Sequence, residues 1–169
     1  LRGHAELTLM LVKEPTIPFV ATKVRFLKWV LRLGDLVTSS DPVAVFDVSR
    51  ALSKHDIALV LGSDKTGNDL YALPNKFFQS VQAGLMIICG PNPAVAKIVR
   101  EHQLGIVLPN WEADSLTSAV QGLSVQDVEA FKAKTRDARF HLSESHSREV
   151  FIRGVSRLLS NNKGNRGVS

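Results

Sequence analysis

Short apolar runs separated by stretches of helical pattern constrain the fold more than any other feature of this chain. Four are clear, and Asp35–Thr38 is a weaker fifth candidate; the four are Leu7–Val12, Ile57–Leu61, Leu85–Cys89 and Ile106–Leu108. Runs that are apolar at nearly every residue are typical of strands buried on both faces of a parallel sheet. Strands that alternate with helices therefore predict an α/β fold, a Rossmann-like parallel sheet with helices on both faces.

The stretches between and after these runs predict the helices. They are Phe19–Leu33, Val43–Ser53, Pro74–Ala83, Ala94–Leu104, Glu112–Gly122, Val125–Arg139 and Ser147–Leu159. Asp41 and Pro42 fit a helix cap followed by a first-turn proline, and Gly84 and Gly105 fit helix ends. The pattern predicts one domain over residues 1–160, with a C-terminal helical extension and then a flexible polar tail, Asn161–Ser169.

Composition narrows the classes of partner. The formal net charge of +5 favours an anionic partner such as a nucleotide, an acidic lipid surface or a nucleic acid. Basic and aromatic residues do not interleave as in a nucleic-acid-binding module, so we do not expect nucleic acid as a partner. No apolar run approaches the roughly 20 residues of a membrane span, and no signal-peptide pattern is present, which predicts a cytoplasmic protein.

The sulfur and imidazole side chains give no sign of a metal or redox site. Cys89 is the single cysteine and lies in an apolar run, where it fits a small buried hydrophobe. The five histidines lack the paired spacing of a metal site, and no cofactor is predicted.

The predicted helix Phe19–Leu33 is basic and amphipathic. Arg25, Lys28 and Arg32 recur at helical spacing, and apolar residues fill the other side. Such a helix could contact an anionic membrane surface, which would make the protein peripheral to a membrane. It could equally pack its apolar face on the sheet and leave the basic residues solvated.

The stretch Ser63–Gly84 carries the most chemical information. It directly follows a predicted strand, and ligands of open α/β sheets bind beyond the carboxyl ends of the strands. Pro74 favours a helix start, so the N–H groups of Asn75, Lys76 and Phe77 should lack intrahelical partners and form an anion cradle. The helix dipole and the Lys76 ammonium would add positive charge for a diphosphate.

The same stretch also fits an ordinary surface loop before a helix. Asn68 and Asp69 could cap turns, Tyr71 could pack its ring, and Lys76 could be a solvated cation. The residues alone do not separate these two interpretations.

A resemblance to a known family favours the phosphate interpretation. The runs that carry it are His55-Asp56-Ile57-Ala58-Leu59-Val60, Asn68-Asp69-Leu70-Tyr71-Ala72-Leu73-Pro74-Asn75-Lys76-Phe77-Phe78-Gln79, Ala83-Gly84-Leu85, the stretch Gly90–Val99, and Gly105-Ile106-Val107-Leu108. Together they resemble the C-terminal, donor-binding domain of GT-B glycosyltransferases, most closely the retaining group called family four. The similarity extends over about Asp35 to Leu159.

The resemblance implies that the chain binds a nucleoside-diphosphate sugar for retaining glycosyl transfer, without a metal. The donor-binding residues that it implies are Ser63, Asp64, Asn68, Tyr71, Leu73, Pro74, Asn75, Lys76 and Gln79. In such enzymes a glutamate at the position of Gln79 typically holds the ribose hydroxyls, and the residue at Tyr71 lies nearer the transferred sugar. Glutamine departs from this pattern, since an amide lacks the charge-assisted hydrogen bonds of a carboxylate.

The family has parts that this sequence would lack. Its basic phosphate-binding motif, the first strand of the domain and the acceptor-binding domain would all precede Leu1. No catalytic residue can therefore be named, and we expect the 169-residue chain alone to be inactive. Two other hypotheses stay open: a non-catalytic or regulatory homologue, for which Gln79 is the sequence hint, and a sugar-nucleotide epimerase or hydrolase of the same architecture.

Overall fold

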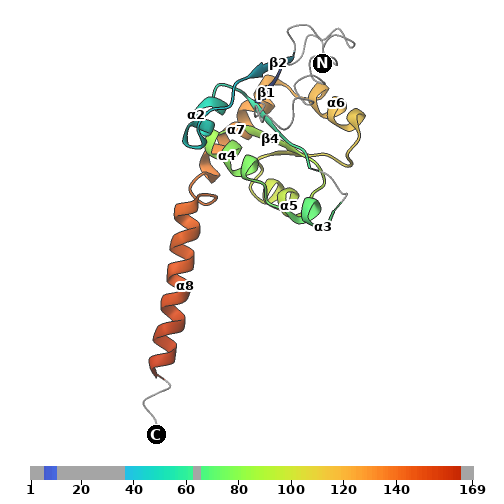
Figure 1. Ribbon diagram of the computed structural model, residues 1–169. Coiled ribbons are helices and arrows are strands. Elements are labelled where there is room, and N and C mark those ends of the chain that lie inside the picture. The colour runs from blue at the N-terminus through green and yellow to red at the C-terminus, as the bar shows by residue number, and fades with distance from the viewer. Residues whose placement is uncertain (1–5, 11–36, 63–65, 165–169) are drawn as a thin grey trace.

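The computed structural model describes residues 6–10, 37–62 and 66–164 (Figure 1). The strands are β1 (Leu7–Met10), β2 (Val37–Ser40), β3 (Ile57–Val60), β4 (Met86–Cys89) and β5 (Gly105–Val107). The helices are the 3-10 turn η2 (Val45–Asp47), α2 (Val48–Leu52), α3 (Gly67–Tyr71), α4 (Asn75–Ala83), α5 (Pro93–Glu101), α6 (Ala113–Gln121), α7 (Val125–Ala138) and α8 (Glu144–Gly164). The predicted helix Phe19–Leu33, with Arg25, Lys28 and Arg32, lies outside the described residues.

The strands pair in parallel, as the alternating pattern predicts. β4 lies between β3 and β5, with Ile57 opposite Met86 and Ile87 opposite Gly105. β1 and β2 form a separate parallel pair, with Leu7 opposite Val37. Among the described residues, β3 has β4 as its one neighbouring strand. The α/β prediction is confirmed, and β2 begins two residues later than the weak candidate strand.

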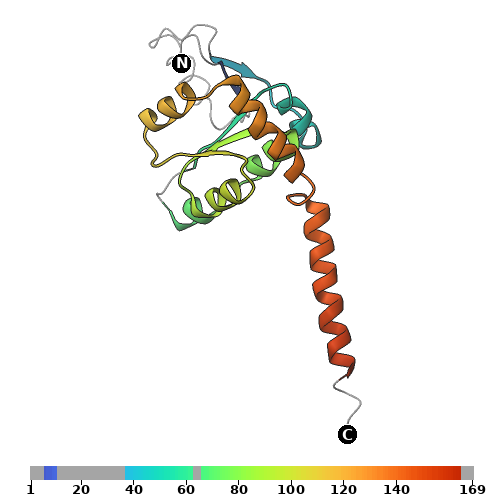
Figure 2. The ribbon, with the colours of Figure 1, turned by 180° about the vertical axis from the view of Figure 1, so that it is seen from behind.

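Helices cover both faces of the three-stranded sheet, which splits the core into two clusters (Figures 1 and 2). One face carries Ile87 and Cys89 and packs against α4 and α5. The other carries Met86 and Ile88 and packs against α6 and the first half of α7. Because neighbouring residues of a strand point to opposite faces, an uninterrupted apolar run supplies both clusters.

Cys89 fills the place expected of a small hydrophobe. It is fully buried and unpaired by any disulfide among the described residues. Burial disfavours the thiolate and raises the pKa of Cys89 to about 11, although Arg100 opposes the shift. A thiol that stays protonated in this way is chemically inert, so it belongs to the core.

The ends of α4 and α5 show how far glycine predicts a helix end. Gly84 has a left-handed φ of 77°, and Leu85 N–H donates to Ser80 O at 3.2 Å, so Gly84 ends α4 as predicted. The end of α5 is different, because Gln103 takes the left-handed conformation, with φ 55°. Gly105 was wrong as a helix end: it is the first residue of β5, where it lies against Ile87.

The helix predicted over Val43–Ser53 is wrong in its first turn. Ala44 is extended, with ψ 146°, and the chain makes a 3-10 turn before the five-residue α2. Asp41 and Pro42 therefore lie before Ala44, the N-cap residue of this turn. The β-branched residues Val43 and Val45 give little support to a helix, and Val45 is 70% exposed, so packing adds none.

The last helix is longer than predicted and extends away from the rest of the structure (Figures 1 and 2). It begins three residues early because the Ser143 hydroxyl accepts a hydrogen bond from His146 N–H at 3.1 Å, which caps its first turn. It continues to Gly164, into the first four residues of the predicted tail; the rest of that tail lies outside the described residues. No proline interrupts the chain there.

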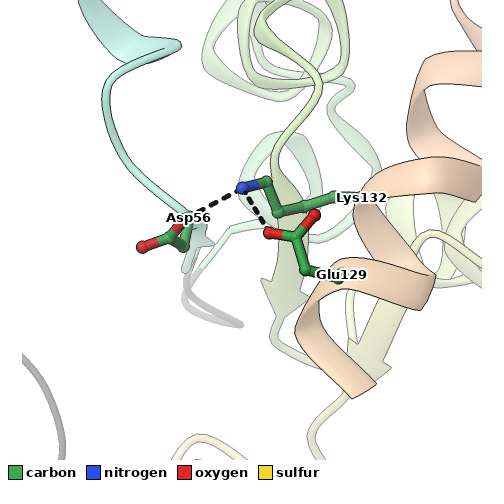
Figure 3. Close-up of polar contacts among 3 residues, drawn as sticks. All are labelled: Asp56, Glu129 and Lys132. Atoms are coloured by element: carbon green, nitrogen blue, oxygen red, sulfur yellow. Dashed lines mark hydrogen bonds and ion pairs between the residues drawn. The ribbon is translucent and has the colours of Figure 1, made fainter. Parts of the chain in front are cut away.

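A lysine ties α7 to the start of β3 (Figure 3). Lys132 Nζ donates to Glu129 Oε1 at 2.8 Å and to Asp56 Oδ1 at 2.9 Å, and its side chain is 16% exposed. The hydrogen bonds to Glu129 and Asp56 raise the pKa of Lys132. The ammonium is thus charged at neutral pH, and its contribution to stability is lost only as pH rises above the ordinary lysine range.

Candidate functional site

The candidate site lies at the carboxyl end of β3, where Leu61 and Gly62 follow the strand. Ser63 and Asp64, two of the predicted site residues, lie outside the described residues. The chain then forms α3, a short helix inside the stretch that the sequence predicts to be a loop. Thr66 Oγ1 caps this helix by accepting from Asp69 N–H at 3.0 Å. A threonine three residues before an aspartate is a signal for a helix start, so the sequence could have predicted this helix.

The side chain of Asn92 joins this segment to the N-terminus of α5 through hydrogen bonds. The sequence did not predict this role. The Asn92 side chain is 5% exposed and caps α5, where Oδ1 accepts from Val95 N–H at 3.1 Å. Its Nδ2 donates to Asp69 O at 2.8 Å and to Ala72 O at 3.5 Å. One buried amide therefore holds α3 and the turn before α4 against the N-terminus of α5.

Pro74 precedes α4 as its N-cap, close to the predicted first-turn position. Phe77 N–H donates to Pro74 O at 2.9 Å, so the prediction that this N–H is free was wrong: the first turn closes in a 3-10 manner. The N–H groups of Asn75 and Lys76 lie too close to the helix start for an i−4 partner. They are the remaining backbone donors of the predicted cradle.

Lys76 lies at the sheet edge where the sequence predicts a phosphate-binding cation. Its Nζ donates to Leu61 O at 2.7 Å, which brings the first turn of α4 to the end of β3. The side chain is exposed, and an ammonium carries three donors. The contact with Leu61 uses one of them and leaves two for a ligand.

The other predicted residues divide into exposed and half-buried groups. Asn68, Tyr71, Leu73 and Asn75 are exposed, with Tyr71 at 65% and Leu73 at 43%. Pro74 and Gln79 are half-buried. Gln79 lies beside α2, since its backbone carbonyl accepts from Ser49 Oγ at 3.4 Å. The structure thus brings residues 68–76 to one sheet edge, with Gln79 one turn farther along α4.

Trp111 is an aromatic residue at this edge that the sequence analysis did not single out. It follows β5 and is half-buried. A Cβ added to Gly62 would lie 3.7 Å from Trp111 Cη2 and 3.8 Å from Asp69 O, and one added to Gly90 would overlap the indole ring. Gly90, after β4, therefore leaves room for the ring, and Gly62, after β3, lies within van der Waals range of it.

A hollow in the structure shares no residue with the predicted site. An open apolar hollow between β5 and α6 is lined by Ile106, Leu108, Pro109, Asp114, Ser115, Ser118 and Ala119, none of them a predicted site residue. Within the described part of the chain, no group of three or more His, Cys, Asp or Glu side chains could hold a metal ion. Nor is any helix there both long and apolar enough to span a membrane.

No protein-family model matches the chain, and no curated protein matches it significantly.

Proposed function

We propose that the carboxyl edge of β3 binds the donor of a glycosyl transfer reaction, a nucleoside-diphosphate sugar. The observation that carries the proposal is the Lys76 ammonium, which lies at the end of β3 beside the N-terminus of α4. Positive charge, backbone N–H groups and a parallel sheet edge then coincide, an arrangement that favours diphosphate binding. The resemblance of residues 68–79 to the donor-binding segment of family-four glycosyltransferases supports the sugar nucleotide in particular.

In this proposal the chain is the donor half of a retaining GT-B glycosyltransferase. The bond between the anomeric carbon and the diphosphate breaks, and the positive charge at Lys76 offsets the negative charge that grows on the leaving diphosphate. The acceptor would be held by a separate domain, which would also supply catalytic residues. A cytoplasmic enzyme of this kind could meet lipid acceptors at an anionic membrane through Arg25, Lys28 and Arg32.

One observation favours a second candidate, a non-catalytic homologue that binds the nucleotide sugar without transferring it. Gln79 replaces the glutamate of the family pattern, and an amide binds ribose hydroxyls less strongly than a carboxylate does. Both candidates require the same ligand. A binding experiment therefore tests the shared part of the proposal before any assay of transfer.

Replacing Lys76 tests the proposed diphosphate contact. We expect Lys76→Ala to weaken the binding of a nucleoside diphosphate by about 1.5–3 kcal/mol, the range for a hydrogen bond to a charged group. Isothermal titration calorimetry would measure the change, and the uncharged nucleoside should bind wild type and variant alike. Lys97→Ala is the matched control, because Lys97 lies on α5 with its side chain 72% exposed and pairs with Glu101. Equal affinities of Lys76→Ala and wild type would exclude Lys76 from the site.

Restoring the acid at position 79 tests whether this residue faces the ribose. We expect Gln79→Glu to tighten the binding of a nucleotide sugar by roughly 1 kcal/mol, because the carboxylate makes charge-assisted hydrogen bonds with the ribose hydroxyls. A 2′,3′-dideoxy nucleotide should show no gain in the same titration. Weaker binding of every nucleotide would instead place residue 79 near the diphosphate, contrary to the proposal.

A further inference from the structure

The ring of Trp111 occupies a space that Gly90 keeps open after β4, and it lies beside Gly62 after β3. Gly90 follows β4, and any Cβ there would overlap the indole, so a larger residue would displace the ring. Gly62 follows β3 and faces the Cη2 end of the same ring. The indole therefore lies across the carboxyl ends of β3 and β4, the part of a parallel sheet where ligands bind.

This ring and the proposed diphosphate contact both lie at the end of β3. Lys76 Nζ donates to the carbonyl of Leu61, and the next residue, Gly62, faces Trp111. A cation and an aromatic ring thus approach two consecutive residues at the end of one strand. Trp111 is half-buried, so part of its surface is accessible.

A nucleoside diphosphate has two chemically different ends that match these groups. Its diphosphate is anionic and suits an ammonium, whereas its base is a flat aromatic ring that gains by stacking on another aromatic ring. A tryptophan offers the largest such surface among the side chains and carries no charge to repel the phosphates.

We propose that Trp111 is the base-stacking residue of this site, with the indole contacting the nucleobase while Lys76 binds the diphosphate. This assignment rests on the proposed function, because it takes the ligand to be a nucleotide. It makes Gly90 a positioning residue, since a side chain at Gly90 would displace the ring.

Tryptophan emission gives a direct readout of the contact. The chain has two tryptophans, so Trp29→Phe leaves Trp111 as the sole reporter. We expect a nucleoside diphosphate to quench its emission in a titration corrected for absorption by the base, and inorganic diphosphate to leave it unchanged.

Calorimetry on Trp111→Leu should show nucleoside-diphosphate affinity falling by about 5- to 150-fold, the range for one lost base–aromatic stack, with inorganic diphosphate affinity preserved. Trp111→Phe should lose less, and Gly90→Ala should weaken nucleoside-diphosphate binding through the displaced ring.

The outcomes separate this assignment from the proposed function. If nucleotides bind in a Lys76-dependent manner while Trp111 emission and the affinity of Trp111→Leu stay unchanged, Trp111 is a packing residue and only the assignment is overturned. Quenching by a nucleotide sugar but not by the matching nucleoside diphosphate would place the sugar on the ring and also overturn it. If calorimetry on the wild-type chain detects no nucleotide or inorganic diphosphate binding, the proposed function fails and the assignment fails with it.

Discussion

Gly105→Ala is expected to destabilise the chain by about 2–5 kcal/mol, which combines backbone strain with overpacking against the buried strand β4. Gly105 lies opposite Ile87 in the β4–β5 pairing, and an added Cβ would overlap the carbonyl oxygen of Ile87. The obstacle is backbone in a strand that is fully buried, so no side chain can move aside. Urea unfolding followed by circular dichroism would measure the loss.

Gly67→Ala is the matched control for the same chemical change. Gly67 is the first residue of α3, and no atom lies within 4 Å of an added Cβ. Alanine there should leave the free energy of unfolding unchanged or raise it by up to about 1 kcal/mol, because alanine favours a helix. If Gly105→Ala were as stable as wild type, the close approach of β5 to Ile87 would be wrong.

The strands could be predicted from the sequence because a strand that is buried on both faces is apolar at nearly every residue. Each run such as Leu85–Cys89 alternates between two core clusters, so every residue in it must be apolar. Helix ends were harder to predict, because a glycine can indicate either a left-handed helix end or a close approach of a neighbouring strand. Gly84 ends a helix, but Gly105 makes room for a neighbouring strand, and Gln103 takes the left-handed turn in its place.

The residues of the candidate site also divide into those that the sequence predicted and those that it did not. The position of Lys76 at the end of β3 followed from a polar stretch after a strand and a proline-initiated helix. Asn92 and Trp111 could not be found in this way, because both come from elements far along the chain and reach the site through tertiary contacts. A local sequence pattern identifies residues of one segment only, whereas the edge of a sheet brings together residues from several segments.

The helix that carries Lys76 places one fully buried aromatic ring, Phe77, in the core from its first turn. Phe77 is 0% exposed and packs in the cluster with Val81, Ile87 and Val99, whereas its neighbour Phe78 is half-buried and meets it edge-on at 5.2 Å between ring centroids. Removing the buried ring would leave a cavity between α4 and the sheet. This contact therefore couples the stability of the domain to the position of the proposed diphosphate site.

Phe77→Ala is expected to lower the free energy of unfolding by about 3–5 kcal/mol, the usual cost of truncating a buried phenylalanine. Phe78→Ala, a matched loss of one ring from the next residue, should cost roughly 1–2 kcal/mol because part of that ring already contacts water. Urea titrations of the two variants would give the difference. Equal losses would show that α4 does not face the sheet through Phe77. Because α4 also positions Lys76, we expect Phe77→Ala to weaken nucleoside-diphosphate binding under conditions where it is still folded, and Phe78→Ala to preserve it.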